Sequence, residues 1–270
     1  MSSTHGNPDL DLALEAARAA GTSIMRVFGN KHEVTYKSPG QPVTAADLEA
    51  DRILHEVLLS ARPDYGWLSE ETVDHPDRLD CDRVWIVDPI DGTRTFIKGK
   101  PEFSISIALA HHGAVVLGVV ANPATGETFW AVRGSGAYLD DARLKVSERA
   151  TADGATIVAS SNELRVGEFS PFRDGWTIQP VGSTAYKLAR VAQGAAEAFL
   201  SRGSKSEWDV AAGDLIVQEA GGRVTDLRRQ PLRYNQPDPY VHGILATNGR
   251  LHEHILAMVD AMPSARRLRD

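Results

Sequence analysis

The chain has 270 residues, of which 36 are acidic and 29 are basic, so its formal net charge is −7. Proteins that bind nucleic acids are usually basic, so this balance argues against a nucleic acid polymer as partner. A hydrophobic fraction of 42% and a charged fraction of 24% are typical of a globular protein and exclude a disordered one.

The only cysteine, Cys81, cannot form a disulfide within the chain, so nothing indicates an oxidising compartment. The most apolar stretch, residues 115–121, is far shorter than the ~20 residues that a membrane span requires. The N-terminus lacks the apolar core of a signal peptide. We therefore expect a cytoplasmic protein without a membrane anchor.

The first part of the chain predicts two helices. An alanine-rich segment that begins at Asp9 or Asp11 and runs to Phe28 has apolar residues at helical spacing. A second helix is expected to begin near Thr44, because Thr44 and Asp47 form the hydroxyl-x-x-carboxylate pattern of a helix start.

After these helices the apolar pattern changes to that of β-strands. Four predicted strands are separated by turn residues at 112–113 and 123–126, which favours an antiparallel meander. The predicted strands are residues 84–87, 103–109, 115–121 and 127–132.

Small and polar residues at 147–154 mark a boundary, after which strand and helix alternate. The later elements are predicted at 156–159, 183–193, 198–200 and 209–220. Alternation of this kind indicates a layered α/β arrangement. We therefore divide the chain into an N-terminal α+β half, residues 1–150, and a C-terminal α/β half, residues 151–270.

The most informative segment is residues 85–93, in which a hydrophobic strand runs into Asp88 and Asp91. Carboxylate and carbonyl oxygens are the ligands that Mg²⁺ prefers. The amides of Gly92 and Thr93, at the start of a helical turn, could receive a phosphate oxygen. The alternative is that Asp91 and Gly92 serve only as turn residues.

Other acidic residues lie at the ends of predicted elements. Glu70 and Glu71 follow a short apolar run, and Asp209 begins the last long helix. For each acid alone, a solvated loop or a helix cap is the simpler interpretation, and Asp47 has the same alternative.

Taken in order, these motifs resemble the inositol monophosphatase superfamily of magnesium-dependent, lithium-sensitive phosphomonoesterases. The resemblance extends from about Asp9 to Asn248, which is nearly the whole chain. The motifs that carry it are Glu70-Glu71, residues 88–93, residues 208–213 and residues 219–222.

The resemblance implies a site for two or three Mg²⁺ ions, with Asp88 bridging two of them. Thr93 and Asp47 would form a hydroxyl–carboxylate pair that, with Glu70, activates a water for in-line attack on phosphorus. The amides of Gly92 and Thr93 would hold the phosphate. The implied metal ligands are Glu70, Asp88, the Ile90 carbonyl, Asp91 and Asp209.

The resemblance also implies the fold, an α-β-α-β-α sandwich with the site between its two halves. The N-terminal half would contain an antiparallel sheet and the C-terminal half a smaller mixed sheet. A homodimer is expected from the same resemblance.

Within the superfamily, residues 91–99 and 231–235 resemble the CysQ-type 3′(2′),5′-bisphosphate nucleotidases, which carry a basic residue where this chain has Arg94 and then a Phe-Ile-Lys run. Inositol-type enzymes place a glutamate seven positions before the helix-start aspartate, where this chain has Arg202, with Lys205 nearby. A cation suits a second phosphate better than a neutral polyol. The alternative is that Arg202 and Lys205 are solvated loop charges.

Residues Gly182, Ser183 and Thr184 match the family segment that contacts the sugar of the substrate, although Ser183 could also be an ordinary helix cap. Asp209 is expected at the substrate as well as at the metal. Together these residues predict a Mg²⁺-dependent enzyme that hydrolyses the 3′-phosphate of 3′-phosphoadenosine 5′-phosphate to give AMP and phosphate. The alternatives are an inositol-1-monophosphatase or a sugar phosphatase of broad specificity. A non-enzymatic module that binds a small phosphorylated metabolite is the alternative outside enzymes.

Overall fold

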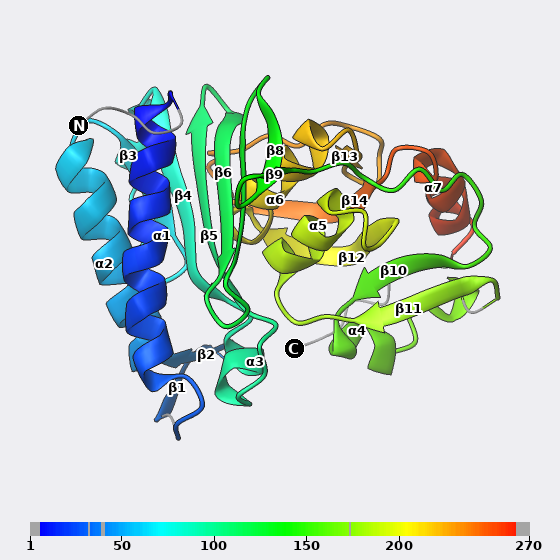
Figure 1. Cartoon of the computed structure of the whole chain (residues 1–270), viewed down its shortest axis with the longest axis horizontal. Coiled ribbons are helices and arrows are strands. Elements are labelled where there is room, and N and C mark those ends of the chain that lie inside the picture. The colour runs from blue at the N-terminus through cyan, green and yellow to red at the C-terminus, as the bar shows by residue number, and fades with distance from the viewer. Residues whose placement is uncertain (1–5, 32, 39–40, 173, 263–270) are drawn as a thin grey trace.

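A computed structural model of the chain describes residues 6–31, 33–38, 41–172 and 174–262. Its elements form five layers, in which helices alternate with sheets (Figure 1). The helices are α1 (Pro8–Val27), α2 (Ala45–Ala61), α3 (Thr93–Ile97), α4 (Ser161–Arg165), α5 (Thr184–Ala192), α6 (Glu207–Glu219) and α7 (His252–Asp260). This arrangement confirms the predicted layered sandwich.

The strands form two larger sheets and one hairpin. The hairpin pairs β1 (Val34–Ser38) with β2 (Gln41–Thr44). The seven-stranded sheet contains β3 (Gly66–Ser69), β4 (Arg83–Asp91), β5 (Ser104–His111), β6 (Ala114–Asn122), β7 (Glu127–Val132), β8 (Gly136–Leu139) and β9 (Ala142–Arg143). The five-stranded sheet has the order β11 (Trp176–Pro180), β10 (Ala155–Ala159), β12 (Ala198–Ser206), β14 (Tyr240–Thr247) and β13 (Arg223–Thr225).

Both N-terminal helices begin at side-chain caps. The side chain of Asn7 accepts hydrogen bonds from the amides of Asp9 and Leu10, so α1 begins slightly before the predicted position. Thr44 and Asp47 form the predicted capping box at the start of α2. These helices pack against each other and cover one face of the large sheet (Figure 1).

The large sheet is mixed. Strands β4 to β9 are antiparallel neighbours in chain order, which confirms the predicted meander. The difference from the prediction is β3, which pairs parallel to β4. Parallel neighbours need a crossover connection instead of a tight turn, and residues 70–82 provide it through a 3₁₀ turn at Pro76–Asp80.

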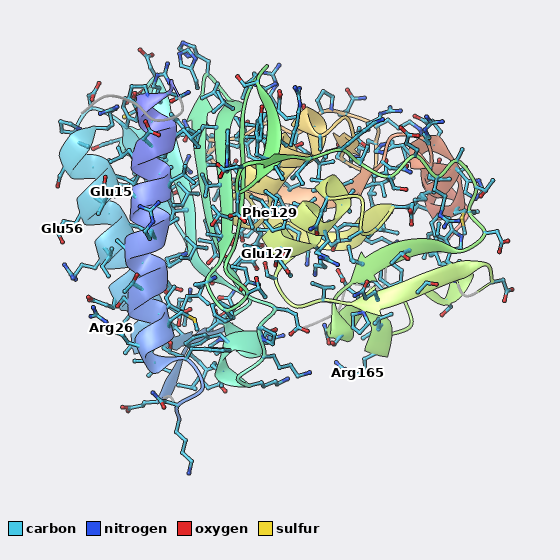
Figure 2. All side chains as sticks on the ribbon, viewed as in Figure 1. Glu15, Arg26, Glu56, Glu127, Phe129 and Arg165 are labelled. Atoms are coloured by element: carbon cyan, nitrogen blue, oxygen red, sulfur yellow. The ribbon has the colours of Figure 1, made fainter. Side chains whose placement is uncertain are left out.

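The central strands are buried on both faces, because successive side chains point to opposite sides of a sheet. On β4, Trp85 belongs to the apolar cluster under α1 and α2, whereas its neighbour Ile86 belongs to the cluster under α5 and α6. Figure 2 shows Phe129 in the interior and the charged side chains of Glu15 and Glu56 on the outer surface of the first layer.

The five-stranded sheet is smaller and mixed, as predicted, with parallel pairs at β10 and antiparallel pairs at β14. Helices α5 and α6 fill the layer between the two sheets, and one apolar cluster there joins Val84 on β4 to Leu188 and Ile244. The division at residue 150 stays a prediction. In the part of the chain that the structure describes, no helix has the length and apolar character needed to cross a membrane.

Candidate active site

The parallel pairing of β3 and β4 brings two acidic residues to the same edge of the large sheet. Ser69 is in register with Val87, and the amide of the next residue, Glu70, donates a hydrogen bond of 3.2 Å to the carbonyl of Val87. Because neighbouring parallel strands end at the same edge, Glu70 lies beside Asp88. An antiparallel β3 would have carried Glu70 away from this edge.

A β-bulge adds Asp91 to this group. In a regular strand, residues three apart point to opposite faces of the sheet. In β4, however, Asp88 pairs with Ser106 and Asp91 pairs with Ser104, so three residue steps on β4 match two on β5. The extra residue reverses the alternation of side chains between the two faces. Pro89 has no amide hydrogen to donate to a neighbouring strand, and proline is tolerated in such a bulge. The bulge therefore directs Asp88 and Asp91 to the same side.

The fourth acidic residue, Asp209, comes from the first turn of α6. This helix begins at Glu207, not at Asp209 or Val210 as predicted, because Ser206 is the capping residue. Asp209 then lies at the third helical position, and its Oδ2 accepts a hydrogen bond of 3.1 Å from the amide of Ser206.

Three of these carboxylates converge. Glu70, Asp88 and Asp209 each offer an oxygen, and the three oxygens lie within 4.8 Å of one another. Asp88 Oδ1 accepts a hydrogen bond from the amide of Ile90, whereas Asp88 Oδ2 is buried and has no hydrogen-bond partner among the described residues. A buried carboxylate oxygen without a partner is costly in the absence of a cation. The donor set and this oxygen fit a hard divalent cation such as Mg²⁺.

The pKa values of the cluster reflect burial and, after it, crowding of like charges. Burial raises the pKa of Asp88 well above its ordinary value, and repulsion from Glu70 and Asp91 adds to the effect. Burial and repulsion from Asp91 and Glu70 raise the pKa of Asp209 to about 8. The cluster therefore resists full ionisation until a cation neutralises it.

Asp91 is engaged by the start of α5. Its Oδ2 accepts hydrogen bonds of 2.5 Å from Ser183 Oγ and from the amide of Ala185. Burial raises the pKa of Asp91, and these hydrogen bonds oppose that rise. Ser183 is also the N-cap of α5, so both interpretations of this residue hold: it caps a helix and it contacts the site.

A hydroxyl–carboxylate pair lies beside the acidic cluster. Thr93 Oγ1 lies 3.0 Å from Asp47 Oδ1 and 3.1 Å from the carbonyl oxygen of Ile90. The other oxygen of Asp47 accepts hydrogen bonds from the amide and hydroxyl of Thr44, at 2.8 and 2.6 Å. Burial raises the pKa of Asp47, and its hydrogen bonds to Thr44 and Thr93 oppose that rise. Asp47 therefore caps its helix and contacts Thr93 at the same time.

Two glycines allow the loops around the site to approach one another. Gly92 has φ +98°, in the left-handed region that favours glycine. A Cβ atom at Gly182 would lie 2.2 Å from the carbonyl oxygen of Glu102. Both positions therefore require glycine for steric reasons, whatever they contact in a substrate.

A buried lysine was missed at the sequence level. The side chain of Lys187 is 1% exposed, and among the described residues its ammonium makes no hydrogen bond and no close ion pair. Burial, with a contribution from neighbouring Lys205, lowers its pKa to about 8, whereas Glu163, Asp91 and Asp209 oppose the shift. A signal was available, since Lys187 is the only charged residue in the apolar run 185–189 of a predicted helix.

The remaining predicted cations lie at different depths. Lys205 Nζ lies 3.7 Å from Glu163 Oε1, and the buried Glu163 also accepts a hydrogen bond of 2.7 Å from Ser201. Arg202 is half-buried on β12, whereas Arg94 is exposed on α3. Thr184, at the first position of α5, is buried.

A second missed lysine contacts the cluster directly. Lys37, on β1, places its ammonium 2.9 Å from Glu70 Oε1 and 2.9 Å from Glu71 Oε1. Burial acts to lower the pKa of Lys37, but the two carboxylates outweigh it and raise the pKa. Burial raises the pKa of Glu71 to about 7. No spacing in the sequence indicated that the hairpin would reach this edge of the sheet.

The layered fold and the carboxylate cluster are those of a protein that can bind a divalent cation, and comparison with known proteins identifies the family. The chain belongs to the inositol monophosphatase family, whose model matches residues 7–264. The family consists of phosphatases that depend on Mg²⁺, and the described residues include an acidic cluster that could bind such an ion.

Individual relatives agree with this assignment. An inositol-1-monophosphatase of Rhizobium meliloti is 40% identical over 227 residues, which cover 80% of this chain and 85% of that protein. The crystal structure of the extragenic suppressor protein SuhB from Bartonella henselae has a TM-score of 0.84 at 33% identity, and covers 95% of this chain and 100% of that one. The structure of CysQ from Bacteroides thetaiotaomicron has a TM-score of 0.73 at 28% identity, and covers 89% of this chain and 97% of that one.

Proposed function

We propose that this chain is a Mg²⁺-dependent phosphomonoesterase whose substrate carries a second anionic group, with 3′-phosphoadenosine 5′-phosphate as the first candidate. Glu70, Asp88, Asp91, Asp209 and the Ile90 carbonyl would hold the metal. When bound, Mg²⁺ neutralises the phosphate, stabilises the leaving oxygen and favours ionisation of the attacking water.

In this proposal, residues of the chain position the attacking water and accept its proton. Thr93 Oγ1 can donate to Asp47 Oδ1 at 3.0 Å, which leaves its lone pairs free to accept a hydrogen bond from the attacking water. Asp47 is held rigidly, because Thr44 occupies its other oxygen. This geometry supports Thr93 and Asp47 as the pair that receives the proton of the water, with Glu70 orienting it from the other side.

The observation that carries the choice of substrate is the buried ammonium of Lys187. The carboxylates of Glu163, Asp91 and Asp209 all act on its pKa, and the last two are candidate metal ligands, yet its ammonium has no hydrogen-bond partner among the described residues. A buried ammonium is costly unless an anion approaches it. Lys205, held near Glu163, adds a second positive charge on the same side. A buried lysine with a second, partly exposed lysine nearby suits a second phosphate better than the neutral hydroxyls of a polyol.

The alternative substrate is inositol 1-phosphate. It is supported about as well, because the relative from Rhizobium meliloti carries the name inositol-1-monophosphatase, and the CysQ structure is less similar than that of SuhB. In this case Lys187 would contact the phosphate that is hydrolysed, and Arg202 and Lys205 would have no substrate partner.

The test is the ratio of kcat/KM for the two substrates in the wild type and in Lys187→Met. We expect the bisphosphate to be preferred, and Lys187→Met to raise its KM by about tenfold, since a charge-assisted hydrogen bond contributes roughly 1.5 to 3 kcal/mol. Lys145→Met is the matched control, because this exposed lysine pairs with Glu148 and with no other acidic residue that the structure describes. A higher kcat/KM for inositol 1-phosphate in the wild type would overturn the nucleotidase assignment and support the alternative.

A further inference from the structure

A buried arginine lies in the connection that follows Glu70. Arg78, in the 3₁₀ turn at Pro76–Asp80, is 3% exposed. Its Nε and Nη2 donate hydrogen bonds of 2.6 and 2.9 Å to the two carboxylate oxygens of Asp74. Its Nη1 donates to Asn235 Oδ1 at 2.6 Å, and its Nη2 also donates to the carbonyl of Gln236 at 2.9 Å. Hydrogen bonds of Arg78 therefore connect the crossover after Glu70 to the turn that contains Asn235 and Gln236.

The same turn also forms hydrogen bonds with Glu207, the first residue of α6. Glu207 is 1% exposed, and its two carboxylate oxygens accept hydrogen bonds from the amides of Asn235 and Gln236, at 2.6 and 2.9 Å. Asn235 has φ +57°, so the turn uses a residue that tolerates the left-handed conformation. Its Nδ2 donates back to the carbonyl of Arg78 at 3.2 Å.

These contacts form a continuous connection between two candidate metal ligands, one of which follows β3 whereas the other lies in the first turn of α6. Glu70 stands at the start of the crossover that Arg78 anchors, and Asp209 follows Glu207 by two residues on α6. The carboxylate oxygens of Glu70 and Asp209 approach within 4.8 Å although both groups repel each other. In the metal-free protein, other contacts must therefore hold the backbone at Glu70 close to the backbone at Asp209 against this repulsion.

We propose that Arg78, Asn235 and Glu207 form a clamp that sets the separation of Glu70 and Asp209, and that these three are positioning residues of the metal site. The clamp keeps the ligands at metal-binding distance in the metal-free protein, so the ion does not have to assemble its own site. The inference rests on the proposed function, because it requires that Glu70 and Asp209 bind the metal. It also gives a role to the 231–235 motif.

The test is calorimetric titration of the full chain with Mn²⁺, without substrate, together with the melting temperature of each variant. Asn235→Gly keeps the left-handed backbone and removes both side-chain contacts with Arg78, whereas Asn235→Asp keeps the oxygen that accepts from Arg78. Arg78→Met removes the arginine itself. Arg62→Met is the matched control, since Arg62 forms a 2.7 Å ion pair with Asp9 that does not reach α6.

We expect Asn235→Gly and Arg78→Met to weaken Mn²⁺ binding about tenfold, as is usual when the groups that orient metal ligands are removed. Asn235→Asp should restore most of the affinity, and Arg62→Met should lower only the melting temperature. Wild-type Mn²⁺ affinity in Asn235→Gly, with or without loss of stability, overturns the clamp. Asp88→Asn tests the proposed metal site separately from the clamp. If this variant binds Mn²⁺ as the wild type does, the proposed metal site is wrong, and the clamp, which depends on it, is wrong as well.

Discussion

Thr93 Oγ1 and Asp47 Oδ1 lie 3.0 Å apart, although Thr93 follows the bulged strand β4 and Asp47 lies in the first turn of α2. Asp47 cannot move toward a different partner without breaking the capping box with Thr44. The start of α2 therefore fixes the position of Asp47, which is the proton acceptor in the proposed reaction. The same carboxylate caps the helix and contacts Thr93.

Removing the Thr93 hydroxyl should lower kcat with little effect on the fold. We expect Thr93→Val to reduce kcat by about a hundredfold or more, which is the usual size of a general acid–base contribution. Thr93→Ser keeps the hydroxyl and should retain kcat within roughly tenfold of the wild type. Steady-state kinetics at saturating Mg²⁺ measures both variants, and equal rates in the two would remove Thr93 from the mechanism.

The crowded carboxylates predict a conflict between stability and function. Asp88→Asn removes one charge from the cluster and keeps the oxygen that accepts from the Ile90 amide. We expect this variant to stabilise the metal-free protein by about 1 to 2 kcal/mol, because a poorly compensated buried charge is lost. Asp91→Asn should gain less, since Asp91 Oδ2 already accepts two hydrogen bonds. Urea unfolding in the presence of a chelator tests this, and a less stable Asp88→Asn would contradict it.

The fold was largely predictable from the sequence, because the periods of the helices and of the β4–β7 meander are strong. The parallel β3 was not predicted, since the pairing direction of a four-residue strand has no local signature. The acidic motifs identified the candidate metal ligands through a family resemblance. Lys37 was missed because its partner Glu70 is 33 residues away, and the contacts of Arg78 with Asn235 and Gln236 span more than 150 residues. Such contacts depend on how the layers pack.

Gly182 predicts a steric effect of substitution. A Cβ atom there would lie 2.2 Å from the Glu102 carbonyl, and the start of α5 would have to shift. We expect Gly182→Ala to destabilise the protein by roughly 2 kcal/mol or more, as overpacking against a rigid backbone does. Gly203→Ala is the control, because in the described part of the chain no atom outside its own neighbours lies within 4 Å of the added Cβ. Urea denaturation compares the two, and equal stabilities would show that the loops at Gly182 can separate freely.

The buried His252 predicts how stability depends on pH. Its ring nitrogens lie 3.0 Å from the hydroxyls of Thr225 and Thr247, and burial lowers its pKa from 6.5 to about 4. Between these values the unfolded chain binds more protons, so stability rises with pH and this contribution is complete above 6.5. From about pH 7 to about pH 5, the neutral ring should account for a loss of about 2 kcal/mol.

His252→Gln should remove that part of the pH dependence while lowering stability at neutral pH through lost packing. The measurement is the free energy of unfolding of both proteins at the two pH values. Parallel pH dependence in the wild type and in His252→Gln would mean that the ring does not titrate between the folded and unfolded states as described.

The central claim is that the carboxylate cluster binds a divalent cation that is required for phosphate release. The most direct measurement is phosphate release from 3′-phosphoadenosine 5′-phosphate and from inositol 1-phosphate, with Mg²⁺, after chelation, and in Asp88→Asn. We predict release by the wild type with Mg²⁺, its loss on chelation and its recovery when Mg²⁺ is restored, with no release by Asp88→Asn. Release that survives chelation, or that Asp88→Asn retains in full, would contradict the account.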